Sequence, residues 1–301
     1  MKNSSLSAFS FCVAISFAAC GSVQTQTTNE PQVIQPTPTP ASSAAAPAPA
    51  GTAVPSTTVP PASSGKFKNS YNSVYTTKPV IAITFDDGPH PTLTPRLLDM
   101  LKQRNIKATF YVVGQNAAEY PEIIKRMDAE GHELGNHSWS HPALNKLSPD
   151  GVRSQMDKTS EAIFAAIGKR PPTMRPPYGA TSAALNARFA NEFGMPSILW
   201  SVDPLDWRRP GAAVITSRIV SNTHPGAIIL VHDIHPGTVD AMPRTLDELL
   251  AKGYQFVTVT ELLKMDEPRP TPTPKPSISP SPEEAAPVPA PAASASPSGT
   301  R

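Results

Sequence analysis

Short apolar segments alternate with longer stretches of helical periodicity between residues 75 and 266, and this alternation constrains the fold more than any other feature of the sequence. Strands are expected at seven apolar segments, namely 80–84, 109–113, 133–135, 173–175, 197–201, 227–231 and 255–259. Helices are expected at 94–104, 121–130, 148–167, 211–221 and 245–252. Alternating strands and helices are typical of a parallel α/β sheet. Seven such units predict an irregular (β/α)7 barrel, related to the eight-stranded TIM barrel.

The composition divides the chain into one domain and two flanks. Of its 37 Pro residues, 20 lie outside residues 75–266, in segments rich in Ala, Ser and Thr. Segments of this kind bury too little apolar surface to offset the entropy of ordering, so disordered linkers are expected at 20–74 and 267–301. The part between them is large enough to bury roughly 70% of its unfolded surface in one core. A single globular domain is therefore expected at 75–266.

The first nineteen residues have the pattern of an export signal. One Lys is followed by an uncharged apolar stretch that is too short to span a bilayer comfortably. Small residues precede Cys20, as in bacterial lipoprotein signals, where that Cys becomes the lipidated first residue. Phe17 stands where such signals usually have Leu, and ordinary cleavage near Ala19 is the alternative. The protein is thus expected to be exported, either as a membrane-anchored lipoprotein facing the periplasm or cell wall or in secreted form.

The charge pattern gives no electrostatic case for nucleic-acid binding. The formal net charge is +2, and the basic residues form no long run. The second cysteine, Cys12, lies inside the signal segment, so no disulfide is expected in the mature domain. Its stability is expected to come from packing.

Two adjacent aspartates, Asp86 and Asp87, follow the first apolar segment and precede a Gly-Pro turn. Neighbouring side chains of a strand point to opposite faces, so these carboxylates share a site only if the chain leaves strand geometry there, which Gly88 and Pro89 favour. Such a pair suits a division of labour in which one carboxylate holds a metal and the other handles protons. A solvated acidic turn is the alternative, because Asp, Gly and Pro are common turn formers.

Two histidines four residues apart, His137 and His141, follow the third apolar segment. On a helical turn this spacing places both imidazoles on one face, within reach of one cation. Together with the aspartate pair, they predict a metal site of two histidines and one aspartate. Three protein ligands leave a coordination position open for water, as catalysis requires. The expected cofactor is one divalent metal, Zn²⁺ first, with Co²⁺ or Ni²⁺ as alternatives that ligand spacing does not separate.

Three further polar clusters follow later apolar segments. Arg175 begins a turn of Pro, Pro, Tyr and Gly, and a cation beside Asp86 would lower the pKa of that carboxyl and keep it ionised. Asp206 and Trp207 suit the orientation of a catalytic group and an apolar wall, with a helix cap beside a buried Trp as the alternative. His232 ends an apolar segment and would point into the barrel mouth, unless it is a satisfied core histidine. All the clusters lie at the carboxyl ends of expected strands, where barrel active sites are built.

These five clusters, in this order, resemble the polysaccharide deacetylase family, which shares the NodB homology domain and is classed as carbohydrate esterase family 4. The resemblance extends from about residue 78 to residue 263, and no motif residue is missing. It implies a metal-dependent hydrolase that removes N-acetyl groups from a polysaccharide containing N-acetylglucosamine. Peptidoglycan N-acetylglucosamine deacetylases are the members that the chain is expected to resemble most.

The resemblance also implies a role for each motif residue. The acid–base group would comprise Asp86 as base, Arg175 as the residue that tunes it, His232 as general acid and Asp206 as its supporting carboxylate. The metal ligands would be Asp87, His137 and His141. The substrate-binding residues would be Tyr178 through its backbone amide, Pro176, Trp207 and Leu230. The amide would help to form an oxyanion hole, and the last two side chains would enclose the acetyl methyl group.

The motifs leave the polymer open. Peptidoglycan is expected first, because a spacer of this length could reach ~100 Å at about 3 Å per residue if fully extended, enough to meet the wall from a membrane anchor. Chitooligosaccharides and O-acetylated xylan are the alternative substrates. A non-catalytic wall-binding protein is a further alternative, but it would be expected to lack Asp86 or a metal ligand. The expected partner is the N-acetylated polysaccharide, bound by a monomer that touches the membrane only through a lipid on Cys20.

Overall fold

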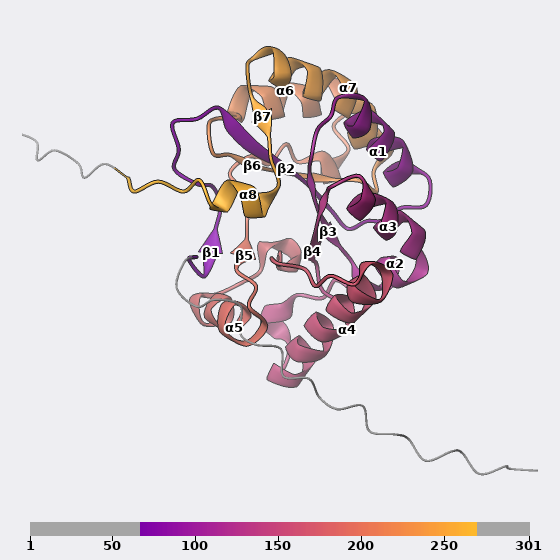
Figure 1. Cartoon of the computed structure of the whole chain (residues 1–301), viewed down its shortest axis with the longest axis vertical. Helices are drawn as coiled ribbons and strands as arrows, with labels where there is room; N and C mark the ends of the chain where they lie inside the picture. The colour runs from indigo at the N-terminus through magenta and orange to yellow at the C-terminus, as the bar shows by residue number, and fades with distance from the viewer. Residues whose placement is uncertain (1–66, 270–301) are drawn as a thin grey trace, which may run out of the picture. The chain divides into compact units, whose positions relative to one another are not determined.

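The computed structural model describes residues 67–269, which are coloured in Figure 1. The expected signal segment, Cys20, the linker up to residue 66 and the tail from residue 270 lie outside them. The strands are β1 (Ser70–Tyr71), β2 (Val80–Asp86), β3 (Thr109–Val112), β4 (Glu133–Asn136), β5 (Ser197–Ile198), β6 (Ile228–His232) and β7 (Gln255–Phe256). The α-helices are α1 (Leu93–Gln103), α2 (Gly114–Glu119), α3 (Pro121–Ala129), α4 (Pro149–Ile167), α5 (Ala183–Phe193), α6 (Ala212–Asn222), α7 (Pro236–Ala251) and α8 (Val259–Leu263). Three short 3-10 turns are η1 (Leu144–Lys146), η2 (Pro177–Gly179) and η3 (Asp206–Arg208).

Parallel pairing organises the strands. The main sheet has the order β4-β3-β2-β6, β7 pairs with the start of β2, and β1 pairs with β5. Single parallel bridges continue the series between the pairs Asn136 and Met174, Met174 and Ser197, and Val202 and Ile229. The predicted α/β class with parallel strands is confirmed, whereas a closed barrel of seven continuous strands stays a prediction.

Strand β2 is buried throughout and separates two hydrophobic clusters. Its odd-numbered residues from Ile81 to Phe85 pack into the larger cluster, under the helices. Its even-numbered residues begin with Val80 and Ala82, which belong to the smaller cluster on the opposite face. Because side chains alternate along a strand, this second face ends at Asp86. The buried strand therefore delivers one carboxylate to the carboxyl end of its inner face.

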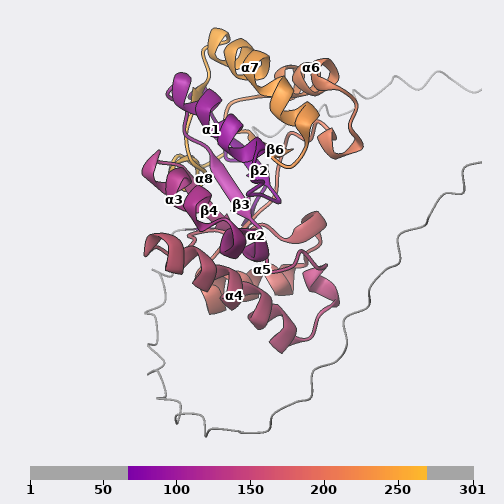
Figure 2. The ribbon, with the colours of Figure 1, turned by 90° about the vertical axis from the view of Figure 1, so that its right-hand side faces the viewer.

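The helices cover the outer face of the strands. Figure 2 shows α7, α1, α3 and α4 in succession along this face, and each contacts the next. Their buried apolar residues, such as Leu97 of α1 and Leu246 of α7, belong to the larger cluster. This layer leaves the carboxyl ends of the strands and the loops after them to form the site.

Side-chain caps fix the ends of several helices. Ser148 precedes α4, and its hydroxyl accepts a hydrogen bond from the Gly151 N–H, while Gly168 ends the helix in the left-handed region at φ 69°. Thr258 and Glu261 form a capping box at the start of α8. The same cap explains an error of the sequence analysis, which continued a strand to residue 259. The strand ends at Phe256, and Val259 begins a helix.

Other expected elements are shorter or longer than the pattern suggested. The segment 173–175 makes only single bridges at Met174 instead of a strand. Helix α7 begins at Pro236, well before the expected 245, and continues through Pro243. A Pro inside a helix is normally disruptive, but α7 buries an apolar face that includes Val239 and Met242, so tertiary packing outweighs the local preference. Helices α2 and α5 were not predicted from the sequence.

The folded part includes residues that the sequence analysis assigned to the linker. Tyr71 and Val74 are buried in the smaller cluster, and β1 pairs with β5. Lys68 forms an ion pair with Asp266 at 2.7 Å. This contact joins the two ends of the described region, although the segment around Lys68 is too short and polar to show any periodicity.

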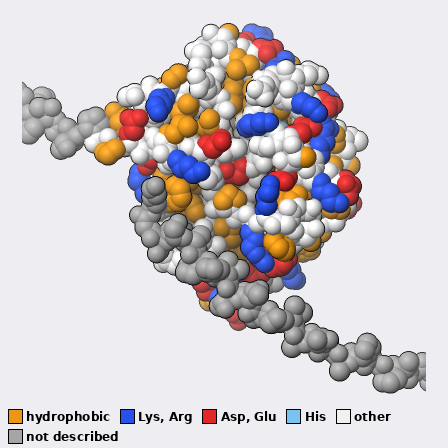
Figure 3. Space-filling view, in the orientation of Figure 1, with side chains coloured by type: hydrophobic (Ala, Val, Ile, Leu, Met, Phe, Trp, Pro, Cys, Tyr) orange, Lys and Arg blue, Asp and Glu red, His pale blue; other side chains and the backbone are white. Residues whose placement is uncertain are grey.

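Charged side chains of both signs are interspersed on the face shown in Figure 3. Over residues 67–269 many charged side chains form ion pairs, such as Arg104 with Asp247 at 2.7 Å and Lys169 with Asp128 at 2.6 Å. Within residues 67–269, no helix combines the length and the apolar character that crossing a membrane would require.

Candidate active site

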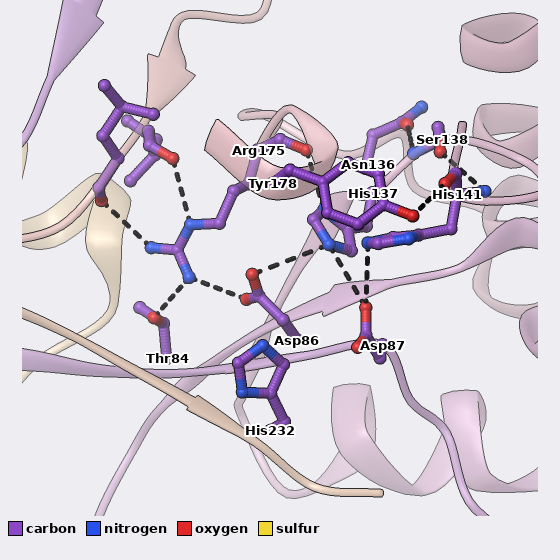
Figure 4. A network of polar contacts seen from close by, with 12 residues as sticks. Thr84, Asp86, Asp87, Asn136, His137, Ser138, His141, Arg175, Tyr178 and His232 are labelled. Carbon is purple, nitrogen blue, oxygen red and sulfur yellow. Dashed lines mark hydrogen bonds and ion pairs between the residues drawn. The ribbon is translucent and has the colours of Figure 1, made fainter. Parts of the chain in front are cut away.

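The predicted polar clusters meet at the carboxyl ends of the parallel strands. Register pairs Asp86 of β2 with His232 of β6 and with Tyr111 of β3. Strand β3 pairs in turn with β4, whose last residue, Asn136, bridges to Met174 just before Arg175. Figure 4 shows the side chains that follow these strand ends converging on one another. The strand pairing therefore collects residues that are far apart in the sequence.

Arg175 is fully buried and is held by four groups. Its guanidinium donates to Asp86 Oδ1 at 2.7 Å and to Thr84 Oγ1 at 2.6 Å, both on the inner face of β2. It also donates to the carbonyls of Ile198 at 3.0 Å and Leu199 at 3.1 Å. The expectation that Arg175 lies beside Asp86 is confirmed. A buried cation needs such partners, because leaving one unpaired is strongly unfavourable.

Asp87 leaves strand geometry, as the aspartate pair required. Its φ of 74° turns its side chain away from the β2 alternation, and Asn116 donates to its carbonyl at 2.8 Å. A Cβ on Gly88 would collide with the buried carboxylate of Asp233, so the close packing favours Gly at the next position. The turn thus separates the two carboxylates, one toward Arg175 and one toward the histidines.

Asp87, His137 and His141 form a cluster suited to a metal ion. One ligand atom from each residue lies within 4.8 Å of the other two. Asp87 Oδ1 is 3.4 Å from His137 Nε2 and 3.2 Å from His141 Nε2. This oxygen is buried and accepts no hydrogen bond within the described part of the chain. One carboxylate and two imidazoles around an unsatisfied buried oxygen are a donor set that fits Zn²⁺ and similar divalent ions.

The protonation states of the cluster favour cation binding. Burial by itself would raise the pKa of Asp87, but the close approach of the His137 imidazole and the charges of the nearby histidines hold that pKa well below its ordinary value. Burial lowers the pKa of His141, and the charge of the neighbouring His137 lowers it further. An ionised carboxylate and a neutral imidazole are the forms that ligate a metal.

The two histidines come together in a different way from the one expected. The segment after β4 is an irregular loop and not a helical turn, with Ser138 at φ 65° and His141 at φ 58°. The loop is held from outside, because Gln155 of α4 accepts from the Trp139 N–H at 2.8 Å and the Ser140 N–H at 2.9 Å. The spacing of four residues was informative, but loop geometry and not helical periodicity brings the rings together.

His232 and Asp206 form a second pair. His232 Nδ1 lies 2.9 Å from Asp206 Oδ1, and the His232 backbone N–H donates to Asp206 Oδ2 at 2.8 Å. Thr238 also donates to Oδ2, at 2.7 Å. Burial by itself would lower the pKa of His232, but the hydrogen bond and charge of Asp206 outweigh it and raise the pKa to about 9. His232 is therefore a cation at neutral pH, with Nε2 left for other contacts.

A cavity of about 470 Å³ is lined both by the cluster of Asp87, His137 and His141 and by His232 of the second pair. Its lining comprises Asp86, Asp87, His137, His141, Pro176, Tyr178, Trp200, Asp203, Trp207, Leu230 and His232. Tyr178 and Trp207 stand at its rim with 71% and 48% of their surfaces exposed, whereas Leu230 is buried. All the residues predicted for the metal and the substrate lie around this cavity. Arg175 and Asp206 stand behind it.

Several residues that support the site were not predicted from the sequence. Tyr111 of β3 lies under the Arg175 guanidinium, 4.2 Å from ring centroid to guanidinium carbon, and Trp200 stands 5.7 Å away. Thr84 could have been found, because it lies two residues before Asp86 and so shares its face of the strand. Thr238 sits in α7, whose early start was not predicted. No local signal marks Tyr111, which reaches Arg175 only through strand pairing.

The chain matches the model of a known protein family. Residues 73–198 match the model described as "Polysaccharide deacetylase". This span includes Asp86, Arg175, Tyr178 and the metal-type cluster, that is Asp87, His137 and His141. It ends before Asp206 and His232.

Named relatives and a solved structure extend the match. The chain is 47% identical over 182 residues to peptidoglycan-N-acetylglucosamine deacetylase PgdA of Listeria monocytogenes, covering 60% of this chain but only 38% of that protein. It is 43% identical over 170 residues to a chitooligosaccharide deacetylase of a Bradyrhizobium species, covering 56% of this chain and 77% of the relative. The crystal structure of the Bc1960 peptidoglycan N-acetylglucosamine deacetylase aligns with a TM-score of 0.63 and 38% identity, over 68% of this chain and 96% of that one.

Replacing Arg175 by Met is expected to lower the free energy of unfolding by about 3–5 kcal/mol, because the buried carboxylate of Asp86 loses its cation. Urea denaturation measures this difference. Arg170→Met is the matched control, since Arg170 pairs with Glu161 at the surface and its loss is expected to change the stability by less than about 1 kcal/mol. Equal effects of the two substitutions would contradict the structural role given to Arg175.

Replacing Asp206 by Asn is expected to move the pKa of His232 from about 9 toward its ordinary value of 6.5, because an amide supplies no negative charge. NMR titration of the metal-free protein measures this pKa. Asp203→Asn is the control, since Asp203 lines the same cavity but makes no contact with His232.

Because the pKa of His232 is raised in the folded state, the stabilisation by Asp206 is complete below the pKa of the unfolded state and is lost as the pH rises through about 9. The substitution should therefore destabilise the protein more at pH 6 than at pH 10.

Proposed function

Because the chain belongs to the polysaccharide deacetylase family, we propose that it is a metal-dependent hydrolase that removes N-acetyl groups from a polysaccharide. The observation that supports this most is the arrangement around one cavity. A carboxylate held by Arg175 and a cluster suited to a metal lie on one side, and the cationic His232 lies at the end of the neighbouring strand. Amide hydrolysis requires these three elements together: a base, an electrophile and an acid.

The chain's own residues supply the acid–base steps. Asp86 would accept a proton from the attacking water, and Arg175, which Thr84 also binds, holds the Asp86 carboxylate in place. His232, positioned by Asp206, would give its Nε2 proton to the departing amine. The Tyr178 N–H would donate to the oxygen on which negative charge develops, a contact worth roughly 3 kcal/mol when aligned. A divalent ion held by Asp87, His137 and His141 would polarise the substrate carbonyl and acidify a water.

The proposed metal is Zn²⁺. Two imidazoles and one carboxylate are common ligands of catalytic zinc, and three protein ligands leave a position open. Co²⁺ and Ni²⁺ accept similar ligands and remain the alternatives. The choice is testable by metal analysis of the protein as purified.

Peptidoglycan is the proposed substrate, with its N-acetylglucosamine residues as the site of reaction. The relative of 47% identity and the solved neighbour are both named for this activity. The exposed rings of Tyr178 and Trp207 at the cavity rim would suit an internal sugar of a polymer. A chitooligosaccharide substrate is the second candidate, because one relative is named for it. An O-acetyl esterase or a non-catalytic wall-binding protein is less favoured, the latter because Asp86 and all three metal-type residues are present.

The proposed location is outside the cytoplasm. The sequence pattern before Cys20 supports export with a lipid on that residue, and the proposed substrate lies in the same compartment. We further propose that the protein acts as a monomer, because all the predicted site residues come from one chain.

The purified protein with Zn²⁺ is expected to release acetate faster from peptidoglycan than from chitooligosaccharides or acetylated xylan. Asp86→Asn is expected to lower the rate by a factor on the order of 10³, since the base is lost while the three metal-type residues remain. Circular dichroism and metal analysis would confirm that the variant keeps its fold and its ion. No acetate from any of the three polymers would contradict the deacetylase proposal, and release from xylan alone would replace it by an O-acetyl esterase.

Replacing Cys20 by Ser is expected to move the protein from the membrane fraction to the soluble fraction, or to block its maturation, because the lipid attaches to the Cys thiol. Fractionation of cells followed by immunoblotting measures the distribution. Cys12→Ser is the matched control and is expected to leave the distribution unchanged. A wild-type protein found wholly in the soluble fraction would favour plain secretion.

A further inference from the structure

The two histidines of the metal-type cluster are held in unequal ways. His137 is buried, with 3% of its side chain exposed, and its Nδ1 makes a 2.7 Å hydrogen bond with the Arg175 carbonyl. This contact fixes the ring and leaves Nε2 toward Asp87. Histidines that bind metals usually have such a partner on the second nitrogen, which sets the orientation of the ring.

His141 has no equivalent partner among residues 67–269. Its side chain is 26% exposed, and the only contact recorded for its ring nitrogens is the one between Nε2 and Asp87 at 3.2 Å. Its backbone is in the left-handed region, at φ 58°, and the direction of the ring is then set by rotation about the side-chain bonds. Something else must hold the imidazole.

The ring of Tyr178 contacts His141 directly. The two ring centroids are 4.6 Å apart with an interplanar angle of 68°, and the Tyr178 hydroxyl donates to the His141 carbonyl at 3.4 Å. His141 also meets the His137 ring, with 4.9 Å between the ring centroids. Figure 4 shows the labelled rings of Tyr178 and His141 beside one another, with the hydroxyl turned toward the loop. The imidazole thus contacts two rings: that of His137, which the Arg175 carbonyl fixes, and that of Tyr178, which meets it edge-on.

Burial does not explain the placement of Tyr178. The residue is 71% exposed, yet its backbone is also in the left-handed region, at φ 61°, which a bulky residue rarely adopts. The turn η2 is closed by the N–H groups of Gly179 and Ala180, so the turn itself does not need a tyrosine side chain. The contact with His141 is the aromatic interaction that this exposed ring makes.

We propose that the Tyr178 side chain is a positioning residue for the metal site, and that it restrains the His141 imidazole in the orientation that binds the ion. The inference rests on the metal site of the proposed function. It is separate from the role proposed for the Tyr178 backbone amide, which every substitution except Pro would retain. The phenyl ring and not the hydroxyl is the main restraint, because 3.4 Å is at the far limit of a hydrogen bond.

The test measures the affinity of the full chain for Zn²⁺ alone, by competition with a zinc chelator and without substrate. Tyr178→Ala is expected to weaken binding about tenfold, at the lower end of the effect of losing a partner that orients a metal ligand. Tyr178→Phe keeps the ring and is expected to remain within about twofold of the wild type. Trp207→Ala is the matched control, because Trp207 lines the same cavity without contacting His141, and its zinc affinity is expected to be unchanged.

Two outcomes would overturn the inference: unchanged zinc affinity in Tyr178→Ala, or an equal loss in Tyr178→Ala and Trp207→Ala. Circular dichroism checks the fold of each variant. If Tyr178→Ala fails to fold, Tyr178→Leu replaces it, since Leu fills space but lacks an aromatic edge, and the same tenfold loss is expected. The proposed function fails separately, when the zinc-loaded wild type releases no acetate. Zinc affinities would then still decide whether Tyr178 positions His141.

Discussion

The buried guanidinium of Arg175 is the interaction on which the site depends. A cation removed from water must have its donors satisfied, and here they are met by Asp86 and Thr84 of β2 and by the carbonyls of Ile198 and Leu199. These groups belong to strands that are not neighbours in the sequence, so the cation ties the carboxyl end of β2 to the segment after β5. Its own backbone carbonyl fixes the His137 ring. One residue therefore aligns the proposed base and one side of the metal-type cluster.

Backbone strain is concentrated at the same edge of the molecule. Asp87, Ser138, His141 and Tyr178 all have φ between 58° and 74°, a region that side-chain-bearing residues seldom occupy. Each lies within or directly beside the cavity lining. Such conformations persist only where surrounding contacts determine them, here the Gln155 contacts of the loop and the close packing of Gly88 against Asp233. The strands and helices beneath are regular, and they supply the rigidity that holds these loops.

Much of the site was predictable because its residues stand in short motifs after apolar segments. The aspartate pair, the histidine pair, Arg175 and His232 were all identified from residue type and spacing, and the structure brings them around one cavity, with Arg175 directly behind its lining. The predictions that were wrong concern local geometry. The histidine loop is not helical, and residues 173–175 form only bridges, because in both places tertiary contacts and not local periodicity decide the backbone.

The amino-acid sequence by itself determined which chemistry is available: paired carboxylates, imidazoles at metal-type spacing, and a parallel α/β framework whose buried strands end in polar side chains. Only the tertiary structure decided how that chemistry is divided. Register between parallel strands sets Asp86 level with His232 and with Tyr111, and the turn at Asp87 sends one carboxylate to Arg175 and the other to the histidines. Residue types and spacings are local properties that a sequence displays. The partners of a buried charge are chosen by contacts between segments far apart in the chain, such as those of Arg175 and Asp86, which are 89 residues apart, and no local pattern records them.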